Sequence, residues 1–243
     1  MVSVVIPAFD EAGTIGASVA AAVRHQQVDE VIVVDDGSSD GTAEVAAAAG
    51  ARVIRLEKNG GKAQALDAGV RAARHNVILF LDADVTGHTD DTLSRIMQPV
   101  IDRRYEMYVG IHERSTLWLN RLLHFFPIIS GERAITRRLW ESVPTVHKNG
   151  FQIEIAMNYS AKRFDRGMGF ELIGGTVHHT KEQKYGFRVG FWRRQVMMAD
   201  VVSISIRLYV FGAITRYVKG LRGGGRSLRV ERRSVVRTGK SVR

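Results

Sequence analysis

The sequence predicts an α/β protein with a mostly parallel, doubly wound sheet flanked by helices. Short apolar runs rich in β-branched residues, such as VSVVIP (2–7) and NVILFL (76–81), are typical of strands that are buried on both faces. Over the first 115 residues these runs alternate with Ala-rich or amphipathic stretches. That alternation is the pattern of βαβ units joined by right-handed crossovers.

The expected elements of this half follow one another without an internal repeat. Asp40-Gly41-Thr42 and Thr89-Asp90-Asp91 offer helix-starting caps, because such side chains accept the first free backbone N–H groups. We expect strands at 2–6, 30–34, 52–56, 76–81 and 106–112, and helices at 12–25, 40–50, 62–74 and 90–103.

The second half is less regular. An apolar stretch at 118–126 (WLNRLLHFF) stops at Pro127, and a turn at Gly131–Arg133 leads toward a helix-like TRRLWESV segment. We expect a helix at 151–164 and a strand at 170–179. A long, mostly apolar segment then runs from 187 to about 218.

Length and composition fit one folded domain with extensions, or at most two domains. The 243 residues include no cysteine, which excludes disulfides and thiolate metal sites. The net charge of +10 is concentrated in residues 216–243, which hold ten Lys or Arg and one acid. A basic tail is typical of an interaction segment, and without aromatic residues after Tyr217 it argues against nucleic acid. No secretory signal is expected.

Acidic residues stand where three of the expected strands end. They are Asp10-Glu11, Asp35-Asp36 and the pair Asp82 and Asp84. Ligands bind beyond the carboxyl ends of the strands in an open α/β sheet, so we expect these carboxylates to converge on one crevice. Asp82-Ala83-Asp84 can share a divalent cation that bridges two phosphates, although a lone pair of this spacing is more often a solvated turn.

The segment Asn59-Gly60-Gly61-Lys62 stands before an expected helix. Its glycines let backbone N–H groups approach an anion, and Lys62 adds a positive charge. The segment lacks the spacing of a P-loop, and no G-x-G-x-x-G follows the first strand. Both absences argue against a nucleoside triphosphatase and a dinucleotide dehydrogenase.

Five motifs together resemble family 2 glycosyltransferases of the glycosyltransferase-A fold. They are VSVVIPAFDEAGTI, VVDDGSSDGT, NGGKAQAL, LFLDAD and SGERA, and the likeness covers about residues 1–180. The family more often has Asn at the position of Asp10. The resemblance implies an inverting, metal-dependent transfer of a sugar from a UDP- or GDP-sugar. It implies a donor site formed by Pro7, Ala8, Glu11, Asp35 or Asp36, Lys62 and Asp82.

The resemblance also implies the metal and the acceptor side. Asp84 would bind Mg²⁺ or Mn²⁺, with His178 or His179 as a further ligand. Glu154 is the candidate general base for a hydroxyl acceptor, and a helix-face Glu paired with Arg or Lys is the alternative. Arg133 could hold an anionic acceptor or the donor diphosphate. GFQIE is similar to the dolichyl- and polyprenyl-phosphate sugar synthase branch, which favours a polyprenyl phosphate acceptor.

The C-terminal part favours a membrane surface as a partner. Charged residues interrupt the apolar pattern between 191 and 218, so an amphipathic interfacial helix fits better than a transmembrane one. A core-packed helix or an oligomer interface is the alternative. We expect a catalytic domain at 1–186, a membrane-associating segment at 187–222 and a basic flexible tail at 223–243, attracted to anionic lipid on the cytoplasmic face of the membrane.

Three functions therefore compete. The first is a glycosyltransferase with a lipid acceptor, and the second uses a small soluble acceptor such as a phosphorylated glycerate. The third is a nucleotide-sugar-binding protein without turnover. Replacing Asp84 with Ala separates the third from the other two, because only an enzyme loses sugar transfer.

Overall fold

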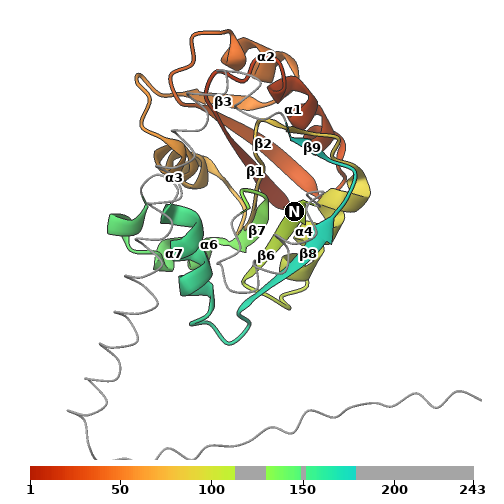
Figure 1. Ribbon diagram of the computed structural model, residues 1–243, viewed down its shortest axis with the longest axis vertical. Coiled ribbons are helices and arrows are strands. Elements are labelled where there is room, and N and C mark those ends of the chain that lie inside the picture. Colours follow the sequence, from red (N-terminus) through yellow and green to blue (C-terminus); the bar gives the residue numbers. More distant parts are fainter. Residues whose placement is uncertain (113–129, 149–151, 179–243) are drawn as a thin grey trace, which may run out of the picture.

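The computed structural model describes residues 1–112, 130–148 and 152–178, and it has the α/β architecture expected from the sequence (Figure 1). A seven-stranded sheet forms its centre, in the order β3-β2-β1-β4-β7-β6-β8. The strands are β1 (Val2–Ala8), β2 (Val28–Asp35), β3 (Arg52–Arg55), β4 (Val77–Phe80), β6 (Met107–His112), β7 (Arg133–Thr136) and β8 (Met168–Ile173).

The sheet is mostly parallel. β1 pairs in parallel with β2 and β4, β2 with β3, and β6 with β8, whereas β7 is antiparallel to β4 and to β6. Arg133, expected in a turn, is the first residue of β7. Its neighbours Ala134 and Ile135 are fully buried, so this segment fills the sheet between β4 and β6.

Helices cover both faces of the sheet (Figure 1). α3, α6 and α7 pack on one face, and α1, α2 and α4 pack on the other. Their bounds, with the short 3₁₀ helix η1, are α1 (Ile15–Arg24), α2 (Thr42–Ala48), α3 (Lys62–Ala72), α4 (Asp90–Ile101), α6 (Arg137–Ser142), η1 (Thr145–His147) and α7 (Gln152–Ala161).

The two expected helix-starting segments behave differently. Thr89 is the N-cap of α4, and its hydroxyl accepts the N–H of Thr92 at 3.2 Å. Gly41, with a φ of 86°, is the N-cap residue of α2, while the carboxylate of Asp40 accepts the N–H of Thr42 at 3.1 Å. The acid therefore still binds the first turn, from one residue further back.

The side chains of β2 divide between the two hydrophobic cores. Ile32 and Val34 join the core under α3, α6 and α7, whereas Val31 and Val33 join the core under α1, α2 and α4. Successive side chains of a strand point to opposite faces, so the two aspartates at the end of β2 are also expected to face opposite ways.

The expected strand at 170–179 is two strands, and the prediction of one continuous strand was wrong. β8 ends at Ile173, and Gly175 has a φ of 84°, which a strand does not accommodate. The chain then forms β9 (Val177–His178), which pairs with β5 (Val85–Thr86) in a separate two-stranded sheet. The glycines thus redirect the chain from the main sheet toward Asp84.

Several expectations concern residues outside the described ranges. They are the apolar stretch at 118–126, the side chain of His178, His179, the segment at 187–222 and the tail at 223–243. In the part of the chain that the structure describes, none of the helices combines the length and the apolar character needed to cross a bilayer.

Candidate active site

Strand register brings the acidic segments to one edge of the sheet. Ala8, the last residue of β1, pairs with Asp35, the last residue of β2. The N–H of Leu81 donates to the carbonyl of Val5 at 3.2 Å, which places Asp82 just beyond β4 at the same edge. The convergence expected from the sequence is therefore present.

The loops after β1 and β2 bind each other. The N–H of Asp10 donates to the hydroxyl of Ser38 at 2.9 Å, and the carboxylate of Asp10 accepts the N–H of Ser39 at 2.9 Å. Asp10 has a φ of 53°, a conformation that Asn and Asp tolerate best among residues with a side chain. Glu11 continues the contact through its N–H, which donates to Thr42 at 2.8 Å. These bonds fix the shape of the β1–α1 loop.

Asp35 and Asp36 face different partners, as the strand alternation requires. The two oxygens of Asp36 accept the N–H groups of Gly60 and Gly61, each at 2.8 Å, on the side of α3. Asp35 accepts the N–H of Ser38 at 3.0 Å and lies 3.9 Å from the guanidinium of Arg55. Only Asp36 therefore binds the loop that carries Lys62.

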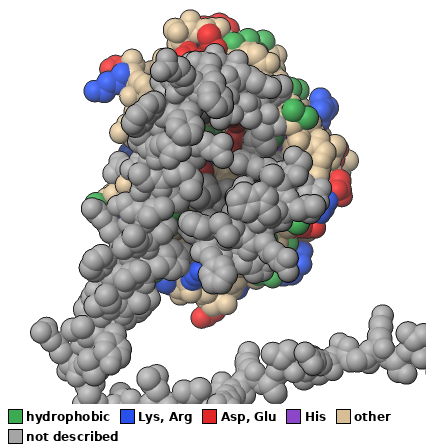
Figure 2. Space-filling model, viewed as in Figure 1, with side chains coloured by type: hydrophobic (Ala, Val, Ile, Leu, Met, Phe, Trp, Pro, Cys, Tyr) green, Lys and Arg blue, Asp and Glu red, His purple; other side chains and the backbone are tan. Residues whose placement is uncertain are grey.

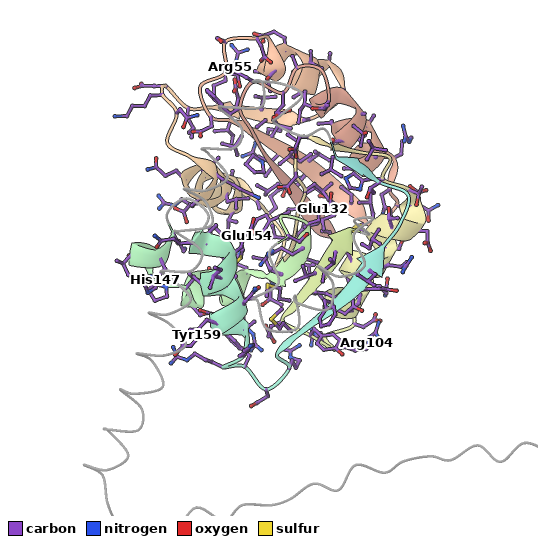
Figure 3. The ribbon with its side chains drawn as sticks, in the orientation of Figure 1. Arg55, Arg104, Glu132, His147, Glu154 and Tyr159 are labelled. Carbon is purple, nitrogen blue, oxygen red and sulfur yellow. The ribbon has the colours of Figure 1, made fainter. Side chains whose placement is uncertain are left out.

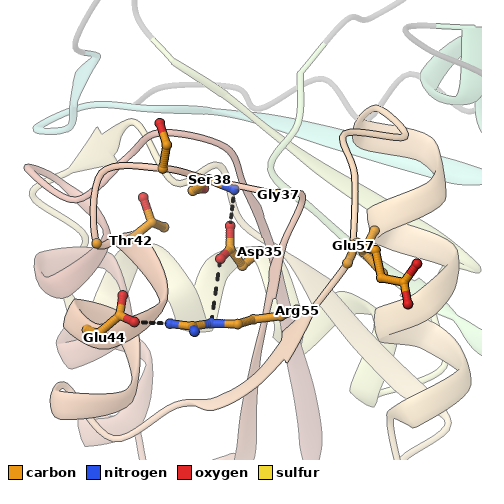
Figure 4. Close-up of a pocket in the computed structure, with 10 residues that line it drawn as sticks. Asp35, Gly37, Ser38, Thr42, Glu44, Arg55 and Glu57 are labelled. Atoms are coloured by element: carbon orange, nitrogen blue, oxygen red, sulfur yellow. Dashed lines mark hydrogen bonds and ion pairs between the residues drawn. The ribbon is translucent and has the colours of Figure 1, made fainter.

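A cavity of about 450 Å³ lies beside Asp35 (Figure 4). Arg55 crosses its floor between Asp35 and Glu44, and hydroxyl groups of the β2–α2 loop line its other side. Nothing in the sequence marks Arg55 as part of this cavity, because an Arg at a strand end is usually a solvated residue.

Lys62 connects two carboxylates from distant parts of the chain. Its ammonium donates to Asp82 at 2.8 Å and to Glu154 of α7 at 2.9 Å. Burial by itself lowers the pKa of the Lys62 ammonium, but the charges and hydrogen bonds of Asp82 and Glu154 outweigh burial and raise its pKa above the ordinary value. Lys62 is therefore a fixed positive charge at this site.

Gly131 lies in close contact with the carboxylate of Asp82. A Cβ atom at this position would lie 2.1 Å from each carboxylate oxygen of Asp82, so only glycine fits without displacing it. The hydroxyl of Ser130 donates to the carbonyl of Gly110 at 2.6 Å and holds this loop to the end of β6. The SGERA motif thus has a steric reason for its glycine.

Arg133 is fully buried, and its guanidinium binds the protein itself. It donates to the carbonyl of Ser130, to the carbonyl of Glu154 at 3.3 Å and to the side chain of Asn158 at 3.1 Å. Burial lowers the pKa of Arg133, and the charges of Glu154 and Asp82 oppose that effect. The guanidinium, expected to hold an acceptor or the diphosphate, instead joins the Ser130 loop to α7.

A buried His–Glu pair that was not predicted from the sequence joins this loop to the segment before α4. The Nε2 atom of His88 is 3.0 Å from a carboxylate oxygen of Glu132, and both side chains are 1% exposed. Figure 3 shows Glu132 and Glu154 toward the middle of the molecule, whereas Arg55, Arg104 and His147 lie at its periphery. Nothing in the spacing of residues 88 and 132 indicates that they meet.

The residues expected to bind a metal come close through β5 and β9. His178 pairs with Val85, the residue after Asp84. A carboxylate oxygen is a ligand that Mg²⁺ and Mn²⁺ prefer, so Asp84 fits such an ion, and an imidazole would be a less usual further ligand. Among the described residues no three acidic or histidine side chains gather as a metal site.

The described surface carries charges of both signs. Figure 2 shows Lys and Arg side chains interspersed with Asp and Glu side chains around the rim of this face. The first 215 residues as a whole are nearly neutral, with 25 basic and 24 acidic side chains.

The chain is similar to known proteins of one family. Residues 3–150 match the model of the family described as "Glycosyl transferase family 2". The glycosyltransferase AglJ of Haloferax volcanii is 32% identical over 196 residues, which cover 73% of this chain and 63% of that protein. Glucosyl-3-phosphoglycerate synthase of Mycolicibacterium paratuberculosis is 40% identical over 93 residues, or 35% of this chain and 28% of that protein. The chain thus spans less than two thirds of the length of these curated relatives.

A solved structure has a similar fold. It is the glucosyl-3-phosphoglycerate synthase of Mycobacterium tuberculosis in complex with Mn²⁺, UDP and phosphoglyceric acid. It superposes with a TM-score of 0.68 at 25% identity, over 84% of this chain and 78% of that chain.

Proposed function

Because the chain belongs to glycosyl transferase family 2, we propose that it moves a sugar from a nucleoside diphosphate donor to an acceptor oxygen. The observation that carries the proposal is the meeting of Lys62, Asp82 and Glu154 at the edge of the sheet where β1, β2 and β4 end. A solved relative that superposes on this chain was crystallised with Mn²⁺ and UDP, which supports a nucleotide donor at this edge.

We assign the donor to the edge of the sheet where β1, β2 and β4 end, beside Asp36 and Lys62. Pro7 and Ala8 would line it from β1 and Glu11 from the loop after β1, while Asp36 holds the Gly60–Gly61 backbone beside it. Asp84 and His178 or His179 would hold Mg²⁺ or Mn²⁺, and the ion would offset the negative charge of the leaving diphosphate.

The transfer itself is proposed as a single displacement with inversion. The acceptor oxygen forms a bond to the anomeric carbon as the bond from that carbon to the diphosphate oxygen breaks. The electron pair of the broken bond stays with the nucleoside diphosphate, and Lys62 lies where it can stabilise that charge. A hydroxyl acceptor must also lose its proton, whereas a phosphate oxygen that is already ionised has none to lose.

We propose a lipid acceptor, with polyprenyl phosphate as the leading choice. The support is the likeness of GFQIE to the polyprenyl-phosphate branch, the mostly apolar segment at 187–222 and the basic tail. The same features favour peripheral attachment to the cytoplasmic face of a membrane.

A soluble phosphorylated acceptor is the second candidate. The observation that favours it is the superposed relative, whose structure contains phosphoglyceric acid. Assays of the full-length protein with UDP-glucose or GDP-mannose and either polyprenyl phosphate in detergent or 3-phosphoglycerate separate the two candidates, because the products differ in solubility.

Donor binding tests the function without knowledge of the acceptor. A UDP- or GDP-sugar should raise the melting temperature of the full-length protein in the presence of Mn²⁺, and EDTA should abolish the shift, since a ligand that binds only the folded state stabilises it. Asp84→Ala should remove the metal-dependent part of the shift and abolish transfer. Glu141→Ala, which removes an exposed carboxylate from α6, should leave both unchanged. Absence of any shift with every donor would contradict the proposed function.

A further inference from the structure

The ammonium of Lys62 is oriented by two carboxylates. An ammonium has three N–H donors, and two of them point to Asp82 and Glu154 at 2.8 and 2.9 Å. The two carboxylates come from opposite sides, one just beyond β4 and one from the first turn of α7. With two donors engaged, the direction of the third is set. The side chain of Lys62 is 24% exposed, and its ammonium has two acceptors among the described residues, which is compatible with a ligand at the third donor.

Arg133 holds Glu154 in place on the side away from Lys62. The side chain of Glu154 is 4% exposed, and its second carboxylate oxygen lies 3.9 Å from the guanidinium of Arg133 and accepts no hydrogen bond from the described residues. Arg133 also donates to the main-chain carbonyl of Glu154, which fixes α7 at this residue. The carboxylate thus has a cation beside each of its oxygens.

This geometry does not suit a general base. A base must present a free oxygen to the proton that it removes, within hydrogen-bond reach of the acceptor. The Glu154 oxygen that faces the site is engaged by Lys62, and the other lies beside Arg133.

We infer that Glu154 is a positioning residue, which directs the Lys62 ammonium at the donor diphosphate instead of taking a proton from the acceptor. The inference rests on the proposed function and deepens it. The third N–H of Lys62 then points to the diphosphate. As the bond to the sugar breaks, this N–H stabilises the diphosphate oxygen that keeps the electron pair. The same geometry fits an acceptor whose attacking oxygen is already ionised, because Glu154 then has no proton to remove.

Donor affinity provides the first test, because a general base does not contribute to it. The dissociation constants of UDP and GDP with Mn²⁺ are measured by calorimetry on the full-length protein and its variants. Glu154→Ala should raise the dissociation constant of the nucleotide that the protein binds by about tenfold. Lys62→Met should have the same effect, because both substitutions remove the directed N–H. Glu154→Gln should stay within about threefold of the unaltered protein, since its amide oxygen can still accept from Lys62. Glu141→Gln is the matched control and should change nothing.

A double-mutant cycle provides the second test. If Glu154 acts through Lys62, the double variant Lys62→Met/Glu154→Gln should transfer sugar as fast as Lys62→Met alone. Glu154→Gln alone should keep transfer within about tenfold. A general base predicts the opposite: Glu154→Gln then loses about a hundredfold or more in transfer with donor affinity intact.

The outcomes separate this inference from the function on which it rests. If the unaltered protein binds neither nucleotide, the proposed function fails. If it binds one and Glu154→Ala binds it equally well, the function stands and the inference is overturned. If Glu154→Ala does not fold by circular dichroism, Glu154→Gln and the cycle with Lys62→Met still decide between the two roles.

Discussion

Single atoms set the geometry of this site, and Gly131 is the clearest case. The Cα of Gly131 faces the carboxylate of Asp82, and a Cβ there would come within 2.1 Å of both oxygens. Asp82 in turn accepts a hydrogen bond from Lys62 at 2.8 Å. The position of Lys62 therefore depends on a residue that contributes no side chain at all.

Gly131→Ala should accordingly damage donor binding more than folding. Asp82 must move away from the new methyl group, and the Lys62 contact moves with it. Overpacking of this kind costs about 1–3 kcal/mol, which corresponds to a loss of about fivefold to about 150-fold in affinity if it falls on the bound state. Calorimetry with UDP or GDP and Mn²⁺ measures it.

Gly13→Ala is the matched control for that substitution. A Cβ at Gly13 meets no heavy atom within 4 Å, and the residue lies in the exposed turn before α1. It should leave donor affinity and melting temperature unchanged. Equal donor affinity in Gly131→Ala and Gly13→Ala would show that the Asp82 position does not matter for the donor.

The kinds of residue at the site were predictable, but their orientations were not. Apolar runs that end in carboxylates reveal the strand ends, so Asp36, Lys62 and Asp82 were expected at one edge. Which of Asp35 and Asp36 faces the Lys62 loop depends on the last residue of β2, and a shift of one residue reverses the answer. The burial of Arg133 depends on contacts with α7 that lie 21 and 25 residues away in the sequence.

At the scale of elements, Glu106 joins three segments that are distant in the sequence. Its carboxylate is fully buried and accepts hydrogen bonds from Thr136 at 2.6 Å and from Arg138 at 2.8 Å, and it pairs with Arg166 at 2.9 Å. The hydrogen bonds of Arg138 hold the pKa of Glu106 below its ordinary value, against the effect of burial. β6, α6 and the turn before β8 thus share one anionic anchor.

Glu106→Gln should destabilise the protein by about 1–3 kcal/mol near pH 7, because it leaves charged donors with a weaker acceptor. Since the pKa of Glu106 is lowered in the folded state, its contribution is complete above the ordinary value of 4.5 and is lost as the pH falls through the folded pKa. Urea unfolding between about pH 6 and about pH 3 should therefore show the difference from the unaltered protein shrinking.

Glu171→Gln serves as the comparison for that experiment. Glu171 pairs with Arg95 at 2.6 Å, but both side chains are more than a third exposed. Water screens such a pair, so its loss should cost less than about 1 kcal/mol. A larger loss for Glu171→Gln than for Glu106→Gln would contradict the role given to the buried anchor.

The sequence pattern predicts the helices of the first half, but it does not predict two features of the strands. The four helices expected in the first half are all present, because each follows a strand and begins where polar residues interrupt an apolar run. β7 was missed since RAIT is short and lies directly before a helix. The break between β8 and β9 was missed because FELIGGTVHH is apolar on both sides of its glycines, and only the positive φ of Gly175 reveals the change of sheet.

At the scale of the whole molecule, the charge is distributed unevenly. Residues 216–243 hold ten basic residues and one acid, while the preceding 215 residues are nearly neutral. A nearly neutral body has little attraction for an anionic surface, and a tail of this charge has much. We therefore expect membrane attachment to depend on the tail and not on the face of the sheet domain.

Vesicle flotation of the full-length protein tests that expectation. The protein should float with vesicles that contain anionic lipid and should be released by high salt, because salt screens surface attraction. Replacing Arg226, Arg229, Arg232 and Arg233 with Gln should weaken binding at least about tenfold, since each basic residue near the surface contributes about 1 kcal/mol. The matched control replaces four exposed cations of the sheet domain with Gln: Arg24, Lys58, Arg103 and Arg163. Equal weakening by the two sets would mean that net charge alone drives attachment, and unchanged binding by both would leave the apolar segment at 187–222 as its source.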